Sequence, residues 1–151
     1  MAHMNIFEAL RVSHQTQREL STRLLASLSD GARRQEIFLE LKSELVAHET
    51  AEERCFYVPL FEHDVTVDAA RHGIAEHHQM DEMVESLEQM DPASAQWREC
   101  AQKLCDKIEH HLSEEEHKFF QEAGKVLTET QKTALAKEYE TEFTTLRVKE
   151  G

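Results

Sequence analysis

Apolar residues recur along most of this chain at alternating spacings of three and four, the pattern that lines one face of a helix. Four long stripes of this kind cover residues 7–28, 41–59, 70–87 and 97–119. Few Gly, Pro or β-branched runs interrupt them. The pattern predicts an all-α fold, an antiparallel up-down-up-down four-helix bundle.

A fifth helix is expected from about Thr128, a capping residue, to Val148. It is highly charged, yet its apolar residues repeat at helical spacing: Leu135, Tyr139, Phe143 and Leu146. We therefore expect a bundle domain over residues 1–126 and a C-terminal helix over residues 127–151. That helix either packs on its own bundle or is read by a protein partner.

Polar side chains interrupt the four stripes at positions where Leu or Ile would be expected. They are His14, His48, Glu52, His77, His111 and Glu115. Residues i and i+4 share a helix face, so the second and fourth helices each aim one imidazole and one carboxylate at a single point. A buried carboxylate without a partner costs roughly several kcal/mol. The set therefore predicts a buried site for two metal ions.

The positions of these residues relative to the turns support the same set. His14 and His48 lie seventeen positions before and after Gly31, so an antiparallel bundle places them at one height. The histidines of the third and fourth helices become level only if the turn between them centres near Ser94. We therefore expect residues 91–96 to form a loop.

Residues 5–125 resemble the hemerythrin-like HHE cation-binding family. The resemblance rests on His14 and on the segments HETAEERCFYVPLF, EHHQMDEMVESL and HHLSEEEHKFF. It implies a non-haem site of two iron ions (Fe2+/Fe3+) joined by an oxo or hydroxo bridge. By position, the four histidines named above become terminal ligands, and Glu52 and Glu115 become bridging carboxylates.

The chain departs from the oxygen-carrying members of that family at two places. Those members have a second histidine where Asp81 stands, and an aspartate one position after the site of Glu115. The resemblance is closer to members with fewer histidines, which are associated with nitric oxide or peroxide chemistry, iron handling and redox sensing. Glu49 and Asp81 are candidate additional ligands.

Several polar residues lie near the predicted ligands or off the apolar stripes. Glu49 and Asp81, together with Gln17 and Tyr57, are expected to orient the imidazoles by hydrogen bonding. The histidines off the stripes are expected on the surface: His63, His72, His78, His110 and His117. A zinc-peptidase HExxH would need a histidine where Glu52 stands, and a ferritin-like site would need Glu and His at i, i+3.

The formal net charge of -13 argues against nucleic acid, which requires clustered Lys and Arg. No stretch approaches the roughly 18 apolar residues that span a bilayer, and the start lacks the order of a signal peptide. The three cysteines have no CxxC spacing and suit a reducing compartment. We expect a cytoplasmic protein without a membrane partner, and we interpret Met1–His3 as a cloning remnant.

Two functions follow from these residues. The first is a di-iron protein that binds or reduces a small oxidant, namely O2, NO or peroxide; a peroxide- or NO-reducing oxidoreductase is one form of it. The second is an iron- or redox-responsive sensor or scaffold whose partner reads the C-terminal helix.

Overall fold

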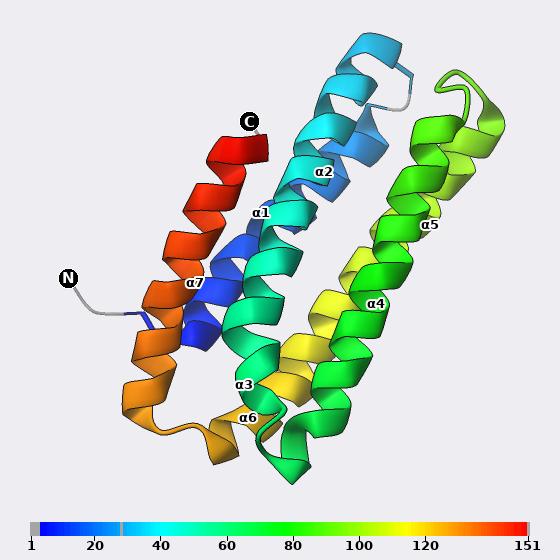
Figure 1. The fold of residues 1–151 in the computed structure, drawn as a ribbon. Helices are drawn as coiled ribbons and strands as arrows, with labels where there is room; N and C mark the ends of the chain where they lie inside the picture. Colours follow the sequence, from blue (N-terminus) through cyan, green and yellow to red (C-terminus); the bar gives the residue numbers. More distant parts are fainter. Residues whose placement is uncertain (1–3, 28, 151) are drawn as a thin grey trace.

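The computed structural model describes residues 4–27 and 29–150, and every regular element in those ranges is helical. Four long helices alternate in direction (Figure 1): α1 (Ile6–Ala26), α2 (Gly31–Glu52), α4 (Asp64–Gln89) and α5 (Ala95–Glu114). The predicted all-α bundle is confirmed. Leu28, at the end of the first predicted stripe, and Met1–His3 lie outside the described residues.

Two of the long helices continue through a turn of π-helix. α2 passes into η1 (Glu53–Tyr57) and α3 (Val58–Leu60), and α5 passes into η2 (Glu115–Phe119) and α6 (Phe120–Val126). A π-turn inserts one extra residue and so rotates the side chains that follow it relative to those before it. The first π-turn begins immediately after the predicted ligand Glu52, and the second begins at the predicted ligand Glu115.

Short polar side chains define where the helices start. Asn5 accepts a hydrogen bond from the backbone N–H of Glu8, whose carboxylate accepts one from the backbone of Asn5. The Asp30 side chain caps α2 by accepting a hydrogen bond from the backbone N–H of Arg33, and the Ser94 side chain caps α5 by accepting one from that of Trp97. These caps satisfy backbone donors that the first helical turn leaves unpaired.

The connection between α4 and α5 tests the expected loop at residues 91–96. α4 ends at Gln89, and α5 begins at Ala95 after its cap at Ser94. The prediction is confirmed for residues 91–94 and wrong for Ala95 and Gln96, because the serine cap starts the helix earlier than the apolar stripe indicated.

Two apolar clusters fill the bundle. One contains Leu10, Phe56 and Phe120 near the end where α1 begins, and the other contains Leu41 and Trp97 near the opposite end. The predicted polar residues lie between these two clusters along the helices. The bundle therefore has a buried polar layer with a dry core on each side of it.

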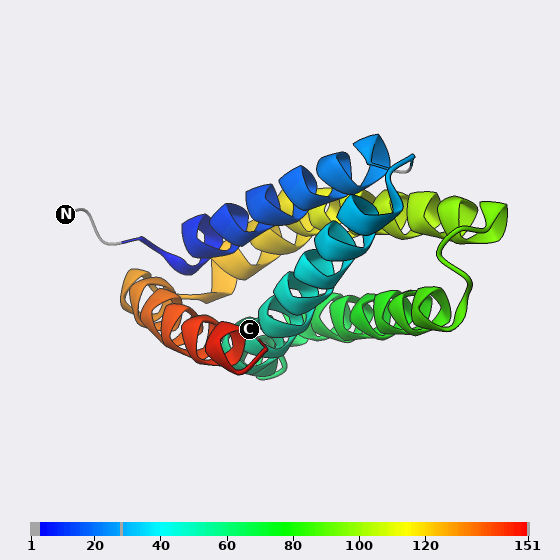
Figure 2. The same cartoon turned by 90° about the horizontal axis from the view of Figure 1, so that it is seen from above.

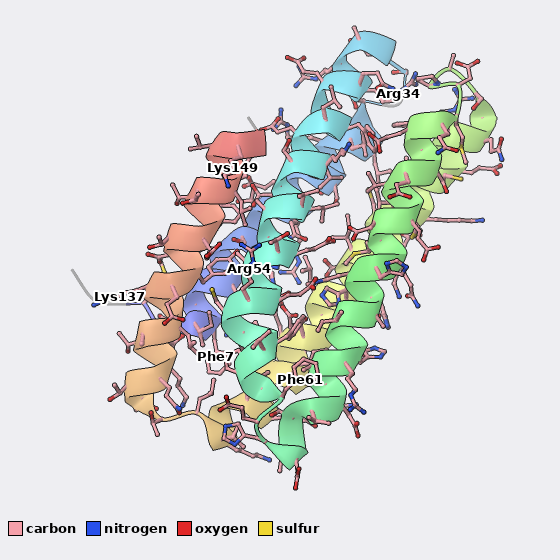
Figure 3. The ribbon with its side chains drawn as sticks, in the orientation of Figure 1. Phe7, Arg34, Arg54, Phe61, Lys137 and Lys149 are labelled. Carbon is pink, nitrogen blue, oxygen red and sulfur yellow. The ribbon has the colours of Figure 1, made fainter. Side chains whose placement is uncertain are left out.

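The last helix, α7 (Glu129–Glu150), lies along α1 and α2 (Figure 2). Leu135 and Tyr139 are buried there, and Phe143 packs against the same apolar cluster. Arg54 of η1 reaches across to Glu142 of α7 with N···O 2.9 Å (Figure 3). The apolar stripe of α7 thus packs on its own bundle. No helix of the described ranges has the length and apolar character of a membrane span.

Candidate metal centre

The structure brings all six predicted site residues into one buried layer. α1 supplies His14, α2 supplies His48 and Glu52, α4 supplies His77, and the junction of α5 with η2 supplies His111 and Glu115. Each is at most 1% exposed. Their ligand atoms form two groups, each with all atoms within 4.8 Å of one another: His14, His48, Glu52 and Glu115, and then Glu52, His77 and His111.

All four imidazoles turn their Nε2 edge into the layer. Each Nε2 atom is buried and has no hydrogen-bond partner, as do both oxygens of Glu52 and Oε1 of Glu115. Buried polar atoms are normally hydrogen-bonded, so a converging set of unpaired lone pairs requires an explanation. Cations placed among them would satisfy all of these atoms at once, and the donor set therefore fits a metal.

The two carboxylates lie between the histidines rather than beside one of them. Glu115 Oε1 is 3.0 Å from His14 Nε2, and its Oε2 is 3.5 Å from His111 Nε2. Glu52 Oε1 is 3.0 Å from His77 Nε2 and 3.5 Å from His48 Nε2. Each carboxylate therefore faces one histidine of the pair His14 and His48 and one of the pair His77 and His111. A ligand that bridges two metal ions needs this placement.

The opposite edge of every imidazole is held by a hydrogen bond. Nδ1 of His14 lies 2.7 Å from Glu116, and Nδ1 of His48 lies 2.7 Å from the hydroxyl of Tyr139. Nδ1 of His77 lies 2.8 Å from Glu53, and Nδ1 of His111 lies 2.8 Å from Glu76. An imidazole that binds metal through Nε2 donates its Nδ1–H to such a partner, which fixes the ring and its tautomer. Metal-binding histidines are held in this way.

Sequence reasoning missed these partners, and two of them carried a signal. Each of the segments that begin at His48 and His111 has the form His-x-x-x-Glu-Glu, so each first glutamate is followed by another. In the structure the first of the pair faces the layer, and the second, Glu53 or Glu116, contacts a histidine of a neighbouring helix. The Glu-Glu dipeptide thus has the same arrangement at the end of α2 and at the end of α5: one glutamate faces the layer and the next holds an imidazole.

The residues expected to orient the imidazoles do not do so. The four Nδ1 contacts leave out Glu49, Asp81, Gln17 and Tyr57. Glu49 and Asp81 also lie outside both ligand groups; they line a groove between α2 and α4, where Glu49 Oε1 is buried without a hydrogen-bond partner. Helical spacing placed them near the layer but could not show which edge of a ring they would meet.

Tyr57 contacts a carboxylate instead of an imidazole. Its hydroxyl donates a hydrogen bond to Oε2 of Glu115. Burial, followed by the Glu115 and Glu52 carboxylates, raises the pKa of Tyr57 well above its usual value, so the phenol keeps its proton. The ring lies against Gly73 of α4, where a Cβ atom would overlap it. Glycine at this position leaves the room that the phenol occupies.

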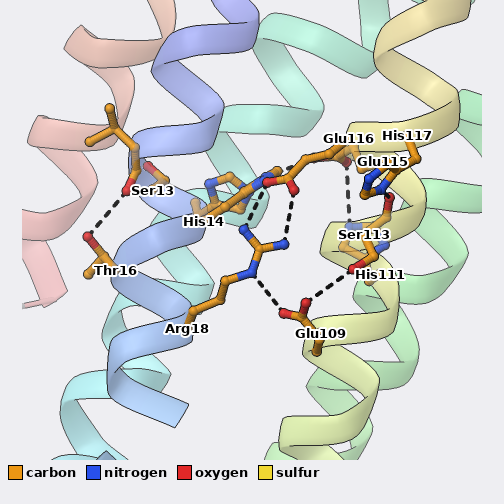
Figure 4. A network of polar contacts seen from close by, with 12 residues as sticks. Ser13, His14, Thr16, Arg18, Glu109, His111, Ser113, Glu115, Glu116 and His117 are labelled. Atoms are coloured by element: carbon orange, nitrogen blue, oxygen red, sulfur yellow. Dashed lines mark hydrogen bonds and ion pairs between the residues drawn. The ribbon is translucent and has the colours of Figure 1, made fainter. Parts of the chain in front are cut away.

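Charged residues at the bundle surface hold two of the outer carboxylates. Arg18 donates to Glu116 through both terminal nitrogens, at 3.1 and 3.0 Å, and to Glu109 at 2.8 Å (Figure 4). Lys107 pairs with Glu76 at 3.1 Å. These cations stabilise the ionised form of the carboxylates that hold the imidazoles.

Protonation within the layer follows from burial and charge. Burial alone would lower the pKa of His14, but the adjacent carboxylates of Glu115 and Glu116 outweigh it and raise the pKa to about 9. Burial, together with the neighbouring Glu52 carboxylate, raises the pKa of Glu115 to about 8. Burial lowers the pKa of His48 to about 4. Without bound cations, the layer therefore holds protons at neutral pH.

The family model of the hemerythrin HHE cation-binding domain matches residues 5–123. The chain belongs to this family. The match covers the four-helix bundle and both ligand pairs, and it ends before α7. Searches among curated proteins and solved structures found no significant match. The family and the His/Glu groups make this a cation-binding domain, and α7 is an addition that the family model does not cover.

Proposed function

We propose that the polar layer binds two iron ions and that the protein binds or reduces a small oxidant, O2, NO or peroxide, at this centre. The observation that supports it most directly is the arrangement of unpaired atoms: four inward Nε2 atoms in two groups, with two carboxylates facing both groups. His14 and His48 would hold one ion, and His77 and His111 the other. Glu52 and Glu115 would contact both.

The donor set favours iron over a structural zinc ion. Structural zinc prefers a closed tetrahedral site, often with thiolate, whereas the six donors here are imidazole and carboxylate groups shared between two positions. None of the three cysteines belongs to either group. When bound, such an iron pair would supply electrons and open coordination positions to a small oxidant.

The chain's own residues would set the conditions for that chemistry. The apolar clusters on both sides of the layer exclude bulk water. Glu53, Glu76 and Glu116 orient three of the imidazoles. Tyr57 places a proton next to Oε2 of Glu115, where a bound oxidant could accept a hydrogen bond or a proton.

A second candidate function, an iron- or redox-responsive sensor, is favoured by the contact between His48 and Tyr139. This contact joins a proposed ligand to α7, the one described helix that the family model leaves out entirely. A change at the metal could then alter how α7 packs, and a partner protein could detect it. This candidate predicts that metal removal loosens α7.

Metal analysis and spectroscopy of iron-loaded protein test the proposal. We expect about two iron ions per chain in the wild type, and a large loss in Glu52→Ala and Glu115→Ala. His78→Ala and His110→Ala are the controls, because both of these histidines lie on the exposed surface. Equal losses in all four variants, or one ion per chain, would contradict the proposed centre.

Addition of O2, NO and peroxide in turn to the reduced protein under anaerobic conditions distinguishes the candidate substrates by their spectra. We expect air to give a stable oxidised protein that does not return to the reduced state when oxygen is removed, because the site has four histidines and carboxylate ligands. Reversible oxygen binding over many cycles would identify a carrier and refute the proposed reactivity.

A further inference from the structure

A second cluster of metal-binding side chains lies outside the polar layer, between α4 and α5. It contains His72, Glu76 and Glu114, whose ligand atoms all lie within 4.8 Å of one another. His72 was expected to be an ordinary surface histidine. Its side chain is indeed half exposed, at 51%, but its ring faces two carboxylates.

The backbone places these three groups as a metal site requires. His72 and Glu76 are one turn apart on the same face of α4, with His72 Nε2 3.4 Å from Glu76 Oε1. Glu114 comes from the facing helix, and its Oε1 is 2.7 Å from the same Nε2 atom. One imidazole and two carboxylates therefore converge from two helices.

Glu76 and His72 are held in place before any ion arrives. Glu76 is only 3% exposed, and its Oε2 accepts a hydrogen bond from Lys107. Its Oε1 accepts one from His111 Nδ1, which leaves a second lone pair on the side of His72. Oε1 of Glu114 is buried and has no hydrogen-bond partner apart from its ion-pair contact with His72 Nε2, and the His72 ring packs edge-on against Phe119. Ion binding therefore requires little further ordering of the Glu76 and His72 side chains.

Solvent reaches the cluster through a pocket of about 420 Å³ that His72 and Glu114 line. Asp68 and Glu122 line the same pocket, with Lys118 as its cation. Carboxylates that outnumber cations favour the entry of positive ions, and the net charge of the chain, -13, acts in the same direction.

We propose that His72, Glu76 and Glu114 form an outer site for a single divalent cation of the zinc or cobalt type, separate from the buried centre. One imidazole and two carboxylates, with water in the remaining positions, suit such an ion. Because Glu76 also holds the Nδ1 of His111, an ion at the outer site draws charge from a group that orients the inner centre. The outer ion therefore changes how strongly His111 donates electrons to the inner centre.

The chain offers a matched control on the same helix. His78 and Glu82 form an i, i+4 pair at 3.4 Å, the distance that separates His72 from Glu76. They belong to no group of three ligands among the described residues. A weak, general affinity of surface histidines for zinc would affect both pairs equally, whereas a built site would involve His72 alone.

The test is equilibrium dialysis of iron-loaded protein against Zn2+, with zinc and iron measured in the same samples. We expect one zinc ion per wild-type chain without loss of iron, an affinity at least about tenfold weaker in His72→Ala and Glu114→Ala, and no change in His78→Ala. Zinc-edge anomalous diffraction should place the ion between α4 and α5. Zinc that displaces iron, or equal binding by His72→Ala and His78→Ala, would overturn the proposal.

A second measurement tests the link to the inner centre. Zinc should shift the absorption bands of the iron-loaded wild type and of His78→Ala, and should leave those of His72→Ala unchanged. Zinc bound at the outer site without any shift would refute the role assigned to Glu76.

Discussion

The phenol of Tyr139 and the imidazole of His48 share a 2.7 Å hydrogen bond although 91 positions separate them in the chain. The same phenol contacts Ser13 of α1 at 2.6 Å. With Nε2 of His48 turned toward the polar layer, Nδ1 carries the hydrogen and donates it to Tyr139. Tyr139 of α7 thereby fixes the ring orientation of His48, a proposed ligand on α2. The C-terminal helix is therefore part of the candidate site.

Tyr139→Phe should weaken metal binding by about 10–100-fold, the usual effect of removing a partner that orients a metal-binding histidine. The ring of Tyr139 would still fill its place, so the fold should persist. Competition with a chelator measures the affinity. Ser13→Ala is the control, because it removes only the other contact of the phenol. An unchanged affinity in Tyr139→Phe would show that the contact does not act on His48.

The two halves of the layer should respond alike to loss of their outer carboxylates. Glu53→Ala and Glu116→Ala each free one imidazole, and we expect each to lower metal affinity by about tenfold or more. Glu109→Ala provides a control, since Glu109 pairs with Arg18 as Glu116 does but contacts no histidine of the layer. If Glu109→Ala costs as much affinity, surface charge rather than ring orientation explains the effect.

Gly73→Ala should destabilise the protein by about 1–3 kcal/mol, because the added Cβ overlaps the ring of Tyr57 and forces it away from Glu115. Gly124→Ala should be neutral or stabilise by up to roughly 1 kcal/mol, since its Cβ meets nothing within 4 Å in helix α6. Denaturant unfolding compares the two free energies. A stable Gly73→Ala with Tyr57 in place would contradict the close packing.

Metal affinity should rise as the pH increases from about 6 to 9, because bound cations require ligands without protons. His14, with a pKa near 9, and Glu115, with a pKa near 8, carry protons at the lower end of this range. They must release these protons when a cation binds. Proton release into a weakly buffered indicator solution measures the effect directly. Binding without proton release at pH 7 would contradict the assigned protonation.

The metal-free protein should show the opposite trend. The raised pKa of His14 contributes stability that is present below about pH 6.5 and is lost as the pH rises through 9. The raised pKa of Glu115 acts in the same direction, because the charged form is disfavoured in the folded state. Thermal unfolding at several pH values, with and without metal, separates the two trends.

Cys100 should react with thiol reagents well before Cys55 and Cys105. Burial raises the pKa of both buried thiols to about 11, and nearby acidic residues act in the same direction. Their labelling should accelerate about tenfold per pH unit below that value, as the thiolate fraction grows. Mass spectrometry after brief alkylation gives the order. Fast labelling of Cys55 at neutral pH would contradict the burial of its thiol.

The candidate site could be predicted from the sequence because its proposed ligands interrupt local, periodic patterns. His48 and Glu52 lie on one helical face whatever else the chain does, and the same holds for His111 and Glu115. The position of Gly31 then places His14 level with His48. These relations depend only on helix geometry and on short connections, so they survive in the structure.

The outer contacts could not be obtained in this way. Glu53 and Glu116 lie beyond the ligand face of their helices, and a π-turn at each position changes the direction of the side chains that follow. A strict helical period cannot represent that insertion. The expected partners of the imidazoles were Glu49, Asp81, Gln17 and Tyr57, whereas Glu53 and Glu116 make two of the contacts.

The sequence by itself predicted the helices and the polar layer, because both are encoded in the spacing of residues within single helices, and the resemblance of three of its segments to the HHE cation-binding family indicated the family. Only the tertiary structure decided how that layer is held. Tyr139 contacts His48 because α7 folds back along α1 and α2, and His72 meets Glu114 because α4 and α5 run side by side. Contacts between distant helices depend on packing angle and on the rotation of each helix, and neither quantity appears in the local pattern.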